Sequence, residues 1–380
     1  MSENNLSFSS KRSLSDSSIN SNPNIEQPIY SIMGVGDPIV DIISEISLNM
    51  IRDYDLELGG SILANENCED RIIEVYSKLE KLPSVNYIPG GSVQNTMRVL
   101  SWSLNNDNTI NRHEYNISML GSVGEDLYKD KIINALDDIG VNPILEILKN
   151  DKTSRCGVGV YQKEKLFVTQ LRASKRLSEK YIEDNLDKIL EHQALIIEGY
   201  LLNNKFDLVK KLCDYFSQNK KLVILTLSAS FIVKIRLNEI IELGNKADII
   251  VGSMEEAKEF PSNNIFNTPE DVFKNIFLKL EPKENRLLLI TDGPNGAYCI
   301  KYNYDTNEFS YKIHIPANKI KDEEIKDLNG AGDAFLGGFL AEYMKGSNIK
   351  DCCKNGINAA TVIIQNVGCT FPKKFNFEKN

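Results

Sequence analysis

The sequence predicts one α/β domain with a central, mostly parallel sheet and helices on both of its faces. Four short runs are apolar on both faces, as central parallel strands are; they span 194–199, 222–227, 248–252 and 286–291. Amphipathic helical patterns alternate with these runs, over 178–192, 206–219 and 269–280. Strands that alternate with helices over such a length are typical of a parallel sheet with crossover helices.

The remaining elements extend this pattern toward both ends of the chain. Residues 31–36 read as a strand that ends in Gly-x-Gly, and 116–121 as another strand, followed by a helix over 128–139. Two helices, over 331–344 and 349–365, close the domain. Open α/β sheets bind ligands at the carboxyl ends of their strands, so we expect the substrate there.

Two β-prone stretches do not fit this alternation of strands and helices. Residues 157–169 alternate between apolar and polar side chains and predict a hairpin with its turn near 162–165, and 39–46 is similarly β-prone. We expect strands from about 39–65 and 153–172 to form a small sheet that stands off the main domain. Such a sheet is either a lid over a ligand or an addition without a functional role.

The first 29 residues differ in composition from the rest of the chain. Eight of the first twenty are serine, and apolar residues are sparse. Such a segment buries too little surface to offset the entropy lost on ordering. We therefore expect a disordered Ser/Asn-rich tail over 1–29 and a folded domain over 30–380.

Charge and composition exclude several classes of protein. A formal charge of −9 is opposite to that of a nucleic-acid binder, and no apolar run approaches the roughly 20 residues of a membrane helix. Seven cysteines without a Cys-x-x-Cys pair and only three histidines argue against zinc and for reduced thiols. We expect a monomeric cytoplasmic protein, with the nucleus as the alternative compartment, that binds small molecules.

The strongest functional signal is the segment Asn329-Gly330-Ala331-Gly332-Asp333. Glycines let the backbone approach a ligand, and the helix predicted after them presents free N–H groups and the positive end of its dipole. This combination is an anion hole suited to a phosphoryl group in transfer. Asp333 lies in the first helical turn, where its carboxylate is either a general base toward a hydroxyl or a helix cap.

The segment Asn-Gly-Ala-Gly-Asp-Ala-Phe at 329–335 resembles the C-terminal signature of the ribokinase-like (PfkB) carbohydrate kinase family. Three other segments agree with it in order and spacing: Gly34-Val35-Gly36-Asp37-Pro38-Ile39-Val40-Asp41, Gly90-Gly91-Ser92-Val93-Gln94-Asn95 and Gly368-Cys369-Thr370-Phe371-Pro372. The last two are similar to the members of the family that phosphorylate adenosine. The resemblance extends from about residue 33 to 372 and implies a ribokinase-like fold with a β lid.

The resemblance implies roles for the residues that match the family's motifs. Those expected to bind the acceptor are Asp37, Asp41, Ser61, Leu63, Gly91, Asn95, Tyr200 and Asn329. Asp41, Gly91 and Asn95 would contact the ribose. Leu63 would line the nucleobase pocket, and Tyr200 would stack on the base. Residues 330–332 would form the anion hole, with Asp333 as the base.

The resemblance also implies ATP as phosphoryl donor, accompanied by Mg²⁺. The residues expected near the nucleotide are Lys165, Ser253, Glu256, Thr291, Asp292 and Gly293. Glu256 matches the acidic residue of a short motif linked to magnesium, and we expect it to act through water. Lys165 stands where a lid arginine reaches the phosphates; it keeps the charge but lacks the bidentate fork.

Other positions depart from the family's pattern. Ser253 and Asp37 stand where asparagine is usual, Leu328 replaces a threonine, and Tyr200-Leu201 occupies the place of an aromatic pair. These departures bear on which nucleobase the protein accepts. The absence of a Gly-x-x-x-x-Gly-Lys-Ser/Thr segment excludes a P-loop kinase.

The expected reaction transfers the γ-phosphoryl group of ATP to the 5′-hydroxyl of adenosine, which gives AMP, a step of purine salvage. Two alternatives stay open. One is a kinase of the same family that acts on another nucleoside or on a sugar. The other is a catalytically silent nucleoside-binding protein with the same fold.

Overall fold

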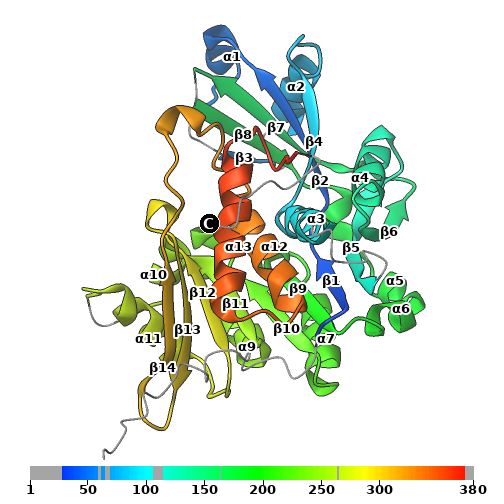
Figure 1. Cartoon of the computed structure of the whole chain (residues 1–380). Coiled ribbons are helices and arrows are strands. Elements are labelled where there is room, and N and C mark those ends of the chain that lie inside the picture. The colour runs from blue at the N-terminus through cyan, green and yellow to red at the C-terminus, as the bar shows by residue number, and fades with distance from the viewer. Residues whose placement is uncertain are drawn as a thin grey trace, which may run out of the picture.

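The computed structural model describes residues 28–58, 61–64, 69–105, 114–162, 164–262 and 265–372. Two sheets lie in these ranges (Figure 1). The large sheet has nine strands, in the order β14 (Glu308–Ile315), β13 (Ala297–Asn303), β12 (Leu287–Thr291), β11 (Ile249–Ser253), β10 (Leu222–Thr226), β9 (Ala194–Glu198), β1 (Ser31–Val35), β5 (Asn116–Gly124) and β6 (Asn142–Leu148).

Neighbouring strands of the large sheet are parallel from β6 to β12. Only β13 and β14 run antiparallel, as a hairpin at one edge. The four apolar runs are β9, β10, β11 and β12, which lie side by side in the sheet. The prediction of a mostly parallel central sheet is therefore confirmed. The edge hairpin was not predicted, because β14 alternates between exposed and half-buried residues and lacks an apolar run.

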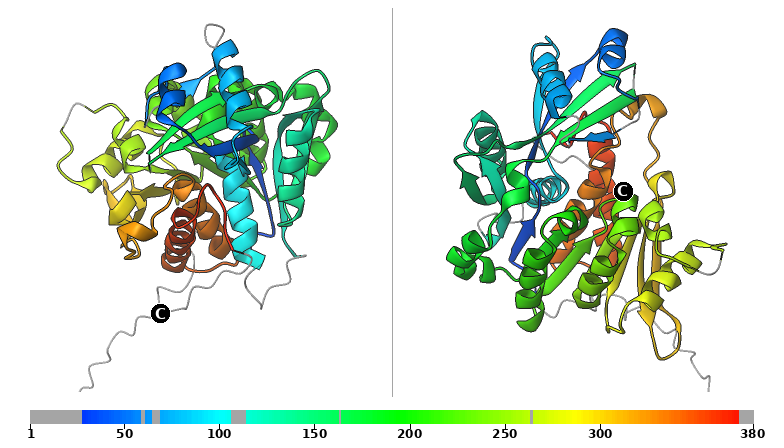
Figure 2. Two further views of the ribbon diagram at one scale, coloured as in Figure 1. Left: turned by 90° about the horizontal axis from the view of Figure 1, so that it is seen from above. Right: turned by 180° about the vertical axis from the view of Figure 1, so that it is seen from behind.

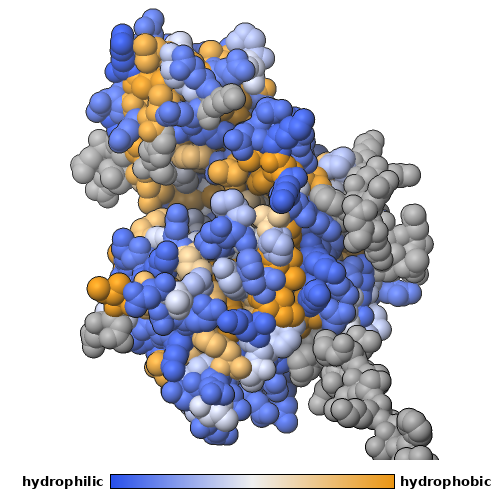
Figure 3. Space-filling view, turned by 60° about the vertical axis from the view of Figure 1, so that its left-hand side comes forward, coloured by the Kyte–Doolittle hydropathy of each residue, from blue (hydrophilic) through white to orange (hydrophobic). Residues whose placement is uncertain are grey.

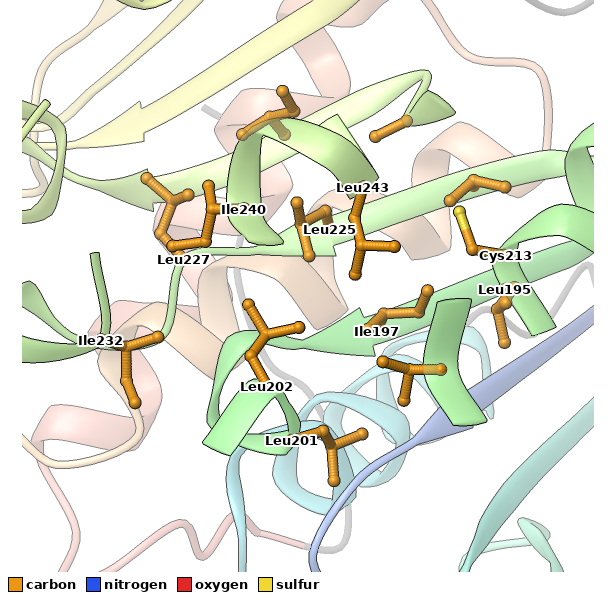
Figure 4. Packing of buried hydrophobic residues seen from close by; sticks show 14 of the residues in the cluster. Leu195, Ile197, Leu201, Leu202, Cys213, Leu225, Leu227, Ile232, Ile240 and Leu243 are labelled. Atoms are coloured by element: carbon orange, nitrogen blue, oxygen red, sulfur yellow. The ribbon is translucent and has the colours of Figure 1, made fainter. Parts of the chain in front are cut away.

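Helices cover both faces of the large sheet (Figure 2). On one face lie α5 (Glu179–Asp184), α6 (Leu186–Leu190), α7 (Phe206–Gln218), α8 (Ser230–Ile235), α9 (Leu237–Lys246), α10 (Met254–Lys258) and α11 (Pro269–Lys279). Figure 4 shows part of this core, where Leu243 lies next to Leu225, and Cys213 next to Leu195. On the other face lie α3 (Ser92–Asn105), α4 (Leu127–Asp137), α12 (Ala331–Met344) and α13 (Ile349–Ile364).

One predicted helix is two. The amphipathic pattern over 178–192 forms α5 and α6, which meet at Asn185. The side chain of Asn185 donates a hydrogen bond to the carbonyl of Tyr181 at 2.8 Å, and its backbone leaves the helical region. An asparagine that bonds to nearby backbone in this way favours a helix end over a helix interior.

The small sheet stands off the large one, with strands in the order β3 (Ser61–Leu63), β8 (Glu164–Gln170), β7 (Ser154–Tyr161), β2 (Ile39–Glu45) and β4 (Asn86–Gly90). The β7–β8 hairpin is antiparallel, as predicted. Helices α1 (Leu48–Asp53) and α2 (Glu69–Leu79) pack on one face. The surface is hollowed between the parts of the molecule that contain the two sheets, and hydrophobic residues line the hollow (Figure 3).

The two ends of the described chain pack on the domain. Ile29, inside the predicted tail, donates its N–H to the carbonyl of Met344 at 3.1 Å, so the folded part begins before residue 30. Residues 1–27 of that tail lie outside the described residues. At the other end, Trp102 stacks on Phe371 and donates to the carbonyl of Pro372. In the described part of the chain, no helix is long and apolar enough to cross a membrane.

Candidate active site

The candidate residues gather at one edge of the large sheet. Strands β1, β9, β10, β11 and β12 run parallel to one another, so their carboxyl ends share this edge. Asp37 follows β1 and Tyr200 follows β9, while Ser253 and Thr291 end β11 and β12 as neighbours in register. The N-termini of α3 and α12 approach the same edge, since Ser92 and Asn95 contact Asp333.

The carboxylate of Asp333 is held by two donors from α3. Ser92 Oγ donates to Asp333 Oδ1 at 2.7 Å, and Asn95 Nδ2 donates to Oδ2 at 3.1 Å. Burial raises the pKa of Asp333 from 3.8 to about 6, and these two hydrogen bonds oppose the rise. A carboxylate held in place, with a pKa closer to neutrality, is suited to accept a proton from a hydroxyl.

The backbone in front of α12 is shaped by glycine. Gly330 is the N-cap residue of α12, and its φ of 77° lies in the left-handed region that favours glycine. A Cβ placed on Gly332 would meet no atom of the described residues within 4 Å. The N–H of Ala331 donates to the carbonyl of Leu328 at 3.3 Å. The space beside Gly332 would let an anion approach the first turn of α12.

A cavity lies between the small sheet and the N-terminus of α12. It is lined by Asp41, Ile43, Asn95, Val158, Lys165, Phe167, Asp327, Asn329, Gly330, Gly368 and Cys369. Five of the residues predicted from the sequence thus meet here from distant parts of the chain: Asp41, Asn95, Lys165, Asn329 and Gly330. Asn95 Oδ1 is buried and has no hydrogen-bond partner among the described residues, so it can accept from a ligand.

Asp41 is a carboxylate in a crowded acidic setting. Burial and the charge of Asp327 raise its pKa from 3.8 to about 7, while Lys165 and Arg98 act in the opposite direction. Gly91 lets the backbone after β4 approach the turn after β1. Its φ is 99°, and a Cβ there would lie only 2.3 Å from the carbonyl oxygen of Asp37. Gly91 therefore shapes the turn that leads into α3.

Lys165 lies on the small sheet and forms an ion pair with Asp327 Oδ2. Asp327 also accepts N–H groups from Asn329 at 3.0 Å and from Gly368 at 2.7 Å. Lys165 lines the cavity together with Asp41 and Asp327. The expectation that Lys165 reaches the ATP phosphates stays a prediction.

A buried network at the end of β9 was not predicted. Glu198 accepts the N–H of Asp37 at 2.7 Å and that of Val93 at 3.0 Å, which ties the turn after β1 to the first turn of α3. Burial and the charge of Asp37 raise the pKa of Glu198 to about 8. Lys205 Nζ pairs with Asp37 Oδ1 at 2.9 Å. The carboxylate of Asp37 is thus engaged by Lys205, and Asp37 does not line the cavity.

The candidate nucleotide residues are held by local contacts. Ser253 and Glu256 form a capping box at the start of α10, with Glu256 Oε2 accepting the N–H of Ser253 at 3.0 Å. Burial raises the pKa of Glu256. Asp292 opens a short turn over Gly293–Asn295, and a Cβ on Gly293 would meet no atom of the described residues within 4 Å.

The remaining predicted residues lie apart from the cavity lining. Leu63, on the edge strand β3, has 53% of its surface exposed, and Ser61 begins the same strand. Tyr200 lies against Phe231, with ring centroids 6.1 Å apart. Burial raises the pKa of the Tyr200 hydroxyl, and the charges of Asp333, Glu198 and Glu256 add to the effect. Tyr200 therefore lies within electrostatic reach of Asp333 and of Glu256.

Sequence reasoning missed Glu198, Asp327 and Arg98. Arg98 is buried within α3 and donates to the carbonyls of Pro89 and Cys369, each at 3.2 Å. A usable signal existed for Glu198 and Arg98, because each is a charged residue within an otherwise apolar segment, and buried charges require partners. Asp327 ends a charged stretch over 321–327 and gave no such signal.

The chain matches the model of the pfkB family of carbohydrate kinases over residues 62–375, and it belongs to that family. With the fold, the glycine-rich helix start and the held carboxylate, this membership defines a phosphotransferase with an alcohol group as acceptor.

The more particular similarity is to adenosine kinases. The chain is 28% identical to adenosine kinase 2 of Arabidopsis thaliana, over 91% of this chain and 97% of that protein. Among solved structures, it is similar to Anopheles gambiae adenosine kinase in complex with P1,P4-di(adenosine-5) tetraphosphate, with a TM-score of 0.77, 28% identity and coverage of 91% and 98%. The chain is also similar to Schistosoma mansoni adenosine kinase in complex with 2-fluoroadenosine. The TM-score is 0.76 and the identity is 26%, over 91% of this chain and 98% of that one.

Proposed function

We propose that this protein transfers the γ-phosphoryl group of ATP to the ribose 5′-hydroxyl of adenosine, a reaction of purine salvage. One observation carries the proposal: Asp333, held by Ser92 and Asn95, lies at the glycine-rich start of α12, beside a cavity that contains a second carboxylate, Asp41. The likeness to adenosine kinases supports adenosine as the acceptor.

The acceptor's ribose fits the polar groups of the cavity. An ionised Asp41 accepts hydrogen bonds from two adjacent hydroxyls, which suits the 2′ and 3′ positions. Asn95 Oδ1 supplies a further free acceptor. The apolar side chains of Ile43, Val158 and Phe167 line the same cavity and give the nucleoside a hydrophobic wall.

The chemical step is an in-line displacement. Asp333 takes the proton of the 5′-hydroxyl, the oxygen forms a bond to the γ-phosphorus, and the bond from that phosphorus to the β–γ bridging oxygen breaks to release ADP. The N–H groups at the start of α12, over 330–332, stabilise the transferred group's negative charge. Closure of the small sheet as a lid would exclude water and suppress hydrolysis of ATP.

The nucleotide binds along the ends of β11 and β12 in this proposal. Thr291, Asp292 and Gly293 lie beside the triphosphate, and Ser253 and Glu256 face it from the neighbouring strand end. The described residues contain no cluster of three metal-ligating side chains, so Mg²⁺ would keep waters and phosphate oxygens as ligands, with Glu256 acting through water. Bound Mg²⁺ would neutralise phosphate charge.

Release of ADP in a panel of acceptors tests the proposal. Adenosine, inosine, guanosine, ribose and fructose are each supplied with Mg²⁺ and ATP, and the expected kcat/KM is highest for adenosine. A preference for ribose or fructose would make the protein a sugar kinase. Binding of adenosine with no ADP release above the ATP-only control would support the silent binding protein.

We also propose a cytoplasmic monomer. Six described cysteines are free and buried, which suits a reducing compartment. Helices α1 and α2 cover one face of the small sheet, so that face is not available for pairing with a second copy. Light scattering coupled to size exclusion tests the monomer, for which the expected mass is 42.8 kDa.

A further inference from the structure

The cavity is lined by one cationic side chain, Lys165, and two carboxylates, Asp41 and Asp327. Lys165 extends from the start of β8, next to the turn of the β7–β8 hairpin, and ion-pairs with Asp327 of the loop before α12. The side chains are 14% and 3% exposed, so water screens this pair weakly. Asp41 lines the same cavity.

The partners of Asp327 are already numerous without Lys165. Backbone N–H groups of Asn329 and Gly368 donate to its two carboxylate oxygens, at 3.0 and 2.7 Å. Asp41, in contrast, has no hydrogen bond to a donor side chain among the contacts of the described residues. Removal of the ammonium charge should therefore destabilise the ionised form of Asp41 more than that of Asp327.

We propose that Lys165 is a positioning residue of the acceptor site, where its ammonium charge keeps Asp41 in the ionised form that accepts hydroxyl hydrogen bonds. This inference rests on the proposed function, because it takes the ligand of Asp41 to be a nucleoside with adjacent hydroxyls. It also assigns Lys165 to the acceptor, whereas its position in the sequence suggests a contact with ATP phosphates.

The charges and titratable groups that act on Asp41 come from every element around it. They are Lys165 on β8, Arg98 on α3, Asp327 before α12, Asp333 on α12, Cys156 on β7 and Cys369 in the C-terminal segment. The two cations favour the ionised carboxylate and the two acids oppose it. Arg98 already donates to two carbonyls and stays in place when Lys165 is changed.

Binding of adenosine as a function of pH, measured by calorimetry without ATP, tests the inference. In the unaltered protein, affinity should rise with pH as Asp41 ionises. In Lys165→Met, which keeps the apolar stem, the midpoint of this rise should move upward by about one pH unit, so that affinity falls about fivefold at pH 7 and recovers toward pH 9. Lys165→Arg, which retains the charge, should keep the parent's midpoint.

The control is Lys78→Met, which removes a charge from an exposed position on α2 and should leave the binding curve unchanged. Steady-state kinetics then separate the two roles of Lys165. A Lys165→Met variant with unchanged adenosine binding but a raised KM for ATP overturns the inference and assigns Lys165 to the phosphates. Failure of the unaltered protein to bind adenosine at all overturns the proposed function and this inference together.

Discussion

The acceptor side and the nucleotide side of the candidate site are built in different ways. On the acceptor side, Asp333 is held by residues 241 and 238 positions away in the chain, and Asp327 pairs with a lysine of the small sheet. On the nucleotide side, Ser253 and Glu256 bond to each other within one helical turn. The acceptor side is therefore pre-organised by tertiary structure, whereas the nucleotide side rests on local caps and open glycine turns.

This difference implies different responses to mutation. Changes on the acceptor side should alter chemistry and discrimination between acceptors, because the groups there are fixed and partly desolvated. Changes on the nucleotide side should act chiefly through access of the phosphates to backbone N–H groups. Substitutions on each side can therefore confirm or contradict this division.

Replacing the base should have the largest effect. Asp333→Asn keeps the size and both neighbours but cannot accept a proton, so kcat should fall by roughly 10²–10⁴ while KM for adenosine changes little. Steady-state ADP release measures both constants. Activity within a few-fold of the parent would remove Asp333 from the catalytic role and leave the acceptor side without a base.

Closing the anion hole should come next. A Cβ at Gly332 meets open space, so Gly332→Val should fold normally yet put its side chain where phosphate oxygens must approach. Turnover should fall by about 100-fold or more, the scale of removing an anion-hole donor. Normal kinetics in a variant whose melting temperature matches the parent's would show that phosphate does not use this helix start.

The ionisation of Asp333 predicts a pH dependence of turnover. Its pKa is raised from 3.8 to about 6 by burial, and only the ionised form accepts a proton, so kcat should decline as pH falls below about 6, approaching tenfold per unit. The measurement is kcat at saturating adenosine and ATP from pH 5 to 8, with melting temperatures to exclude unfolding. A flat profile down to pH 5 would contradict it.

Discrimination between nucleosides sharpens the role of Asp41. Removing the 2′-hydroxyl leaves part of a buried acceptor unpaired, at a cost of about 1–3 kcal/mol, so adenosine should exceed 2′-deoxyadenosine by roughly tenfold in kcat/KM. In Asp41→Ala this ratio should shrink toward one while activity drops. Because the comparison is made within each variant, general damage to the fold cancels. An undiminished ratio would exclude Asp41 as the ribose ligand.

The smallest effect is expected from the Ser/Asn-rich N-terminal segment, which belongs to neither side. Deletion of residues 1–27 should change kcat/KM by less than about twofold and the melting temperature by less than about one degree. The reason is that the composition of this segment allows little packing. The deletion stops short of Ile29, which bonds to Met344. A substantial loss in either quantity would mean that the segment contributes to the site or to the core.

The sequence predicted what depends on local pattern. Four apolar runs identified neighbouring central strands, and the glycines before Asp333 located the helix start, because both signals are contained in short segments. The sequence did not reveal Glu198, Asp327 or Arg98, whose partners lie on other elements. It did not reveal the ion pair between Lys165 and Asp327 either, since position along a hairpin does not determine which carboxylate a side chain meets across a cavity.

The C-terminal segment ties the last described residues to the candidate site. Gly368 donates to Asp327, the carbonyl of Cys369 accepts from Arg98, and the carbonyl of Pro372 accepts from Trp102. Gly368 and Cys369 thereby complete the lining of a cavity whose first member along the chain is Asp41. A chain that stopped before residue 368 would lack this part of the lining, so the cavity depends on residues from both ends of the domain.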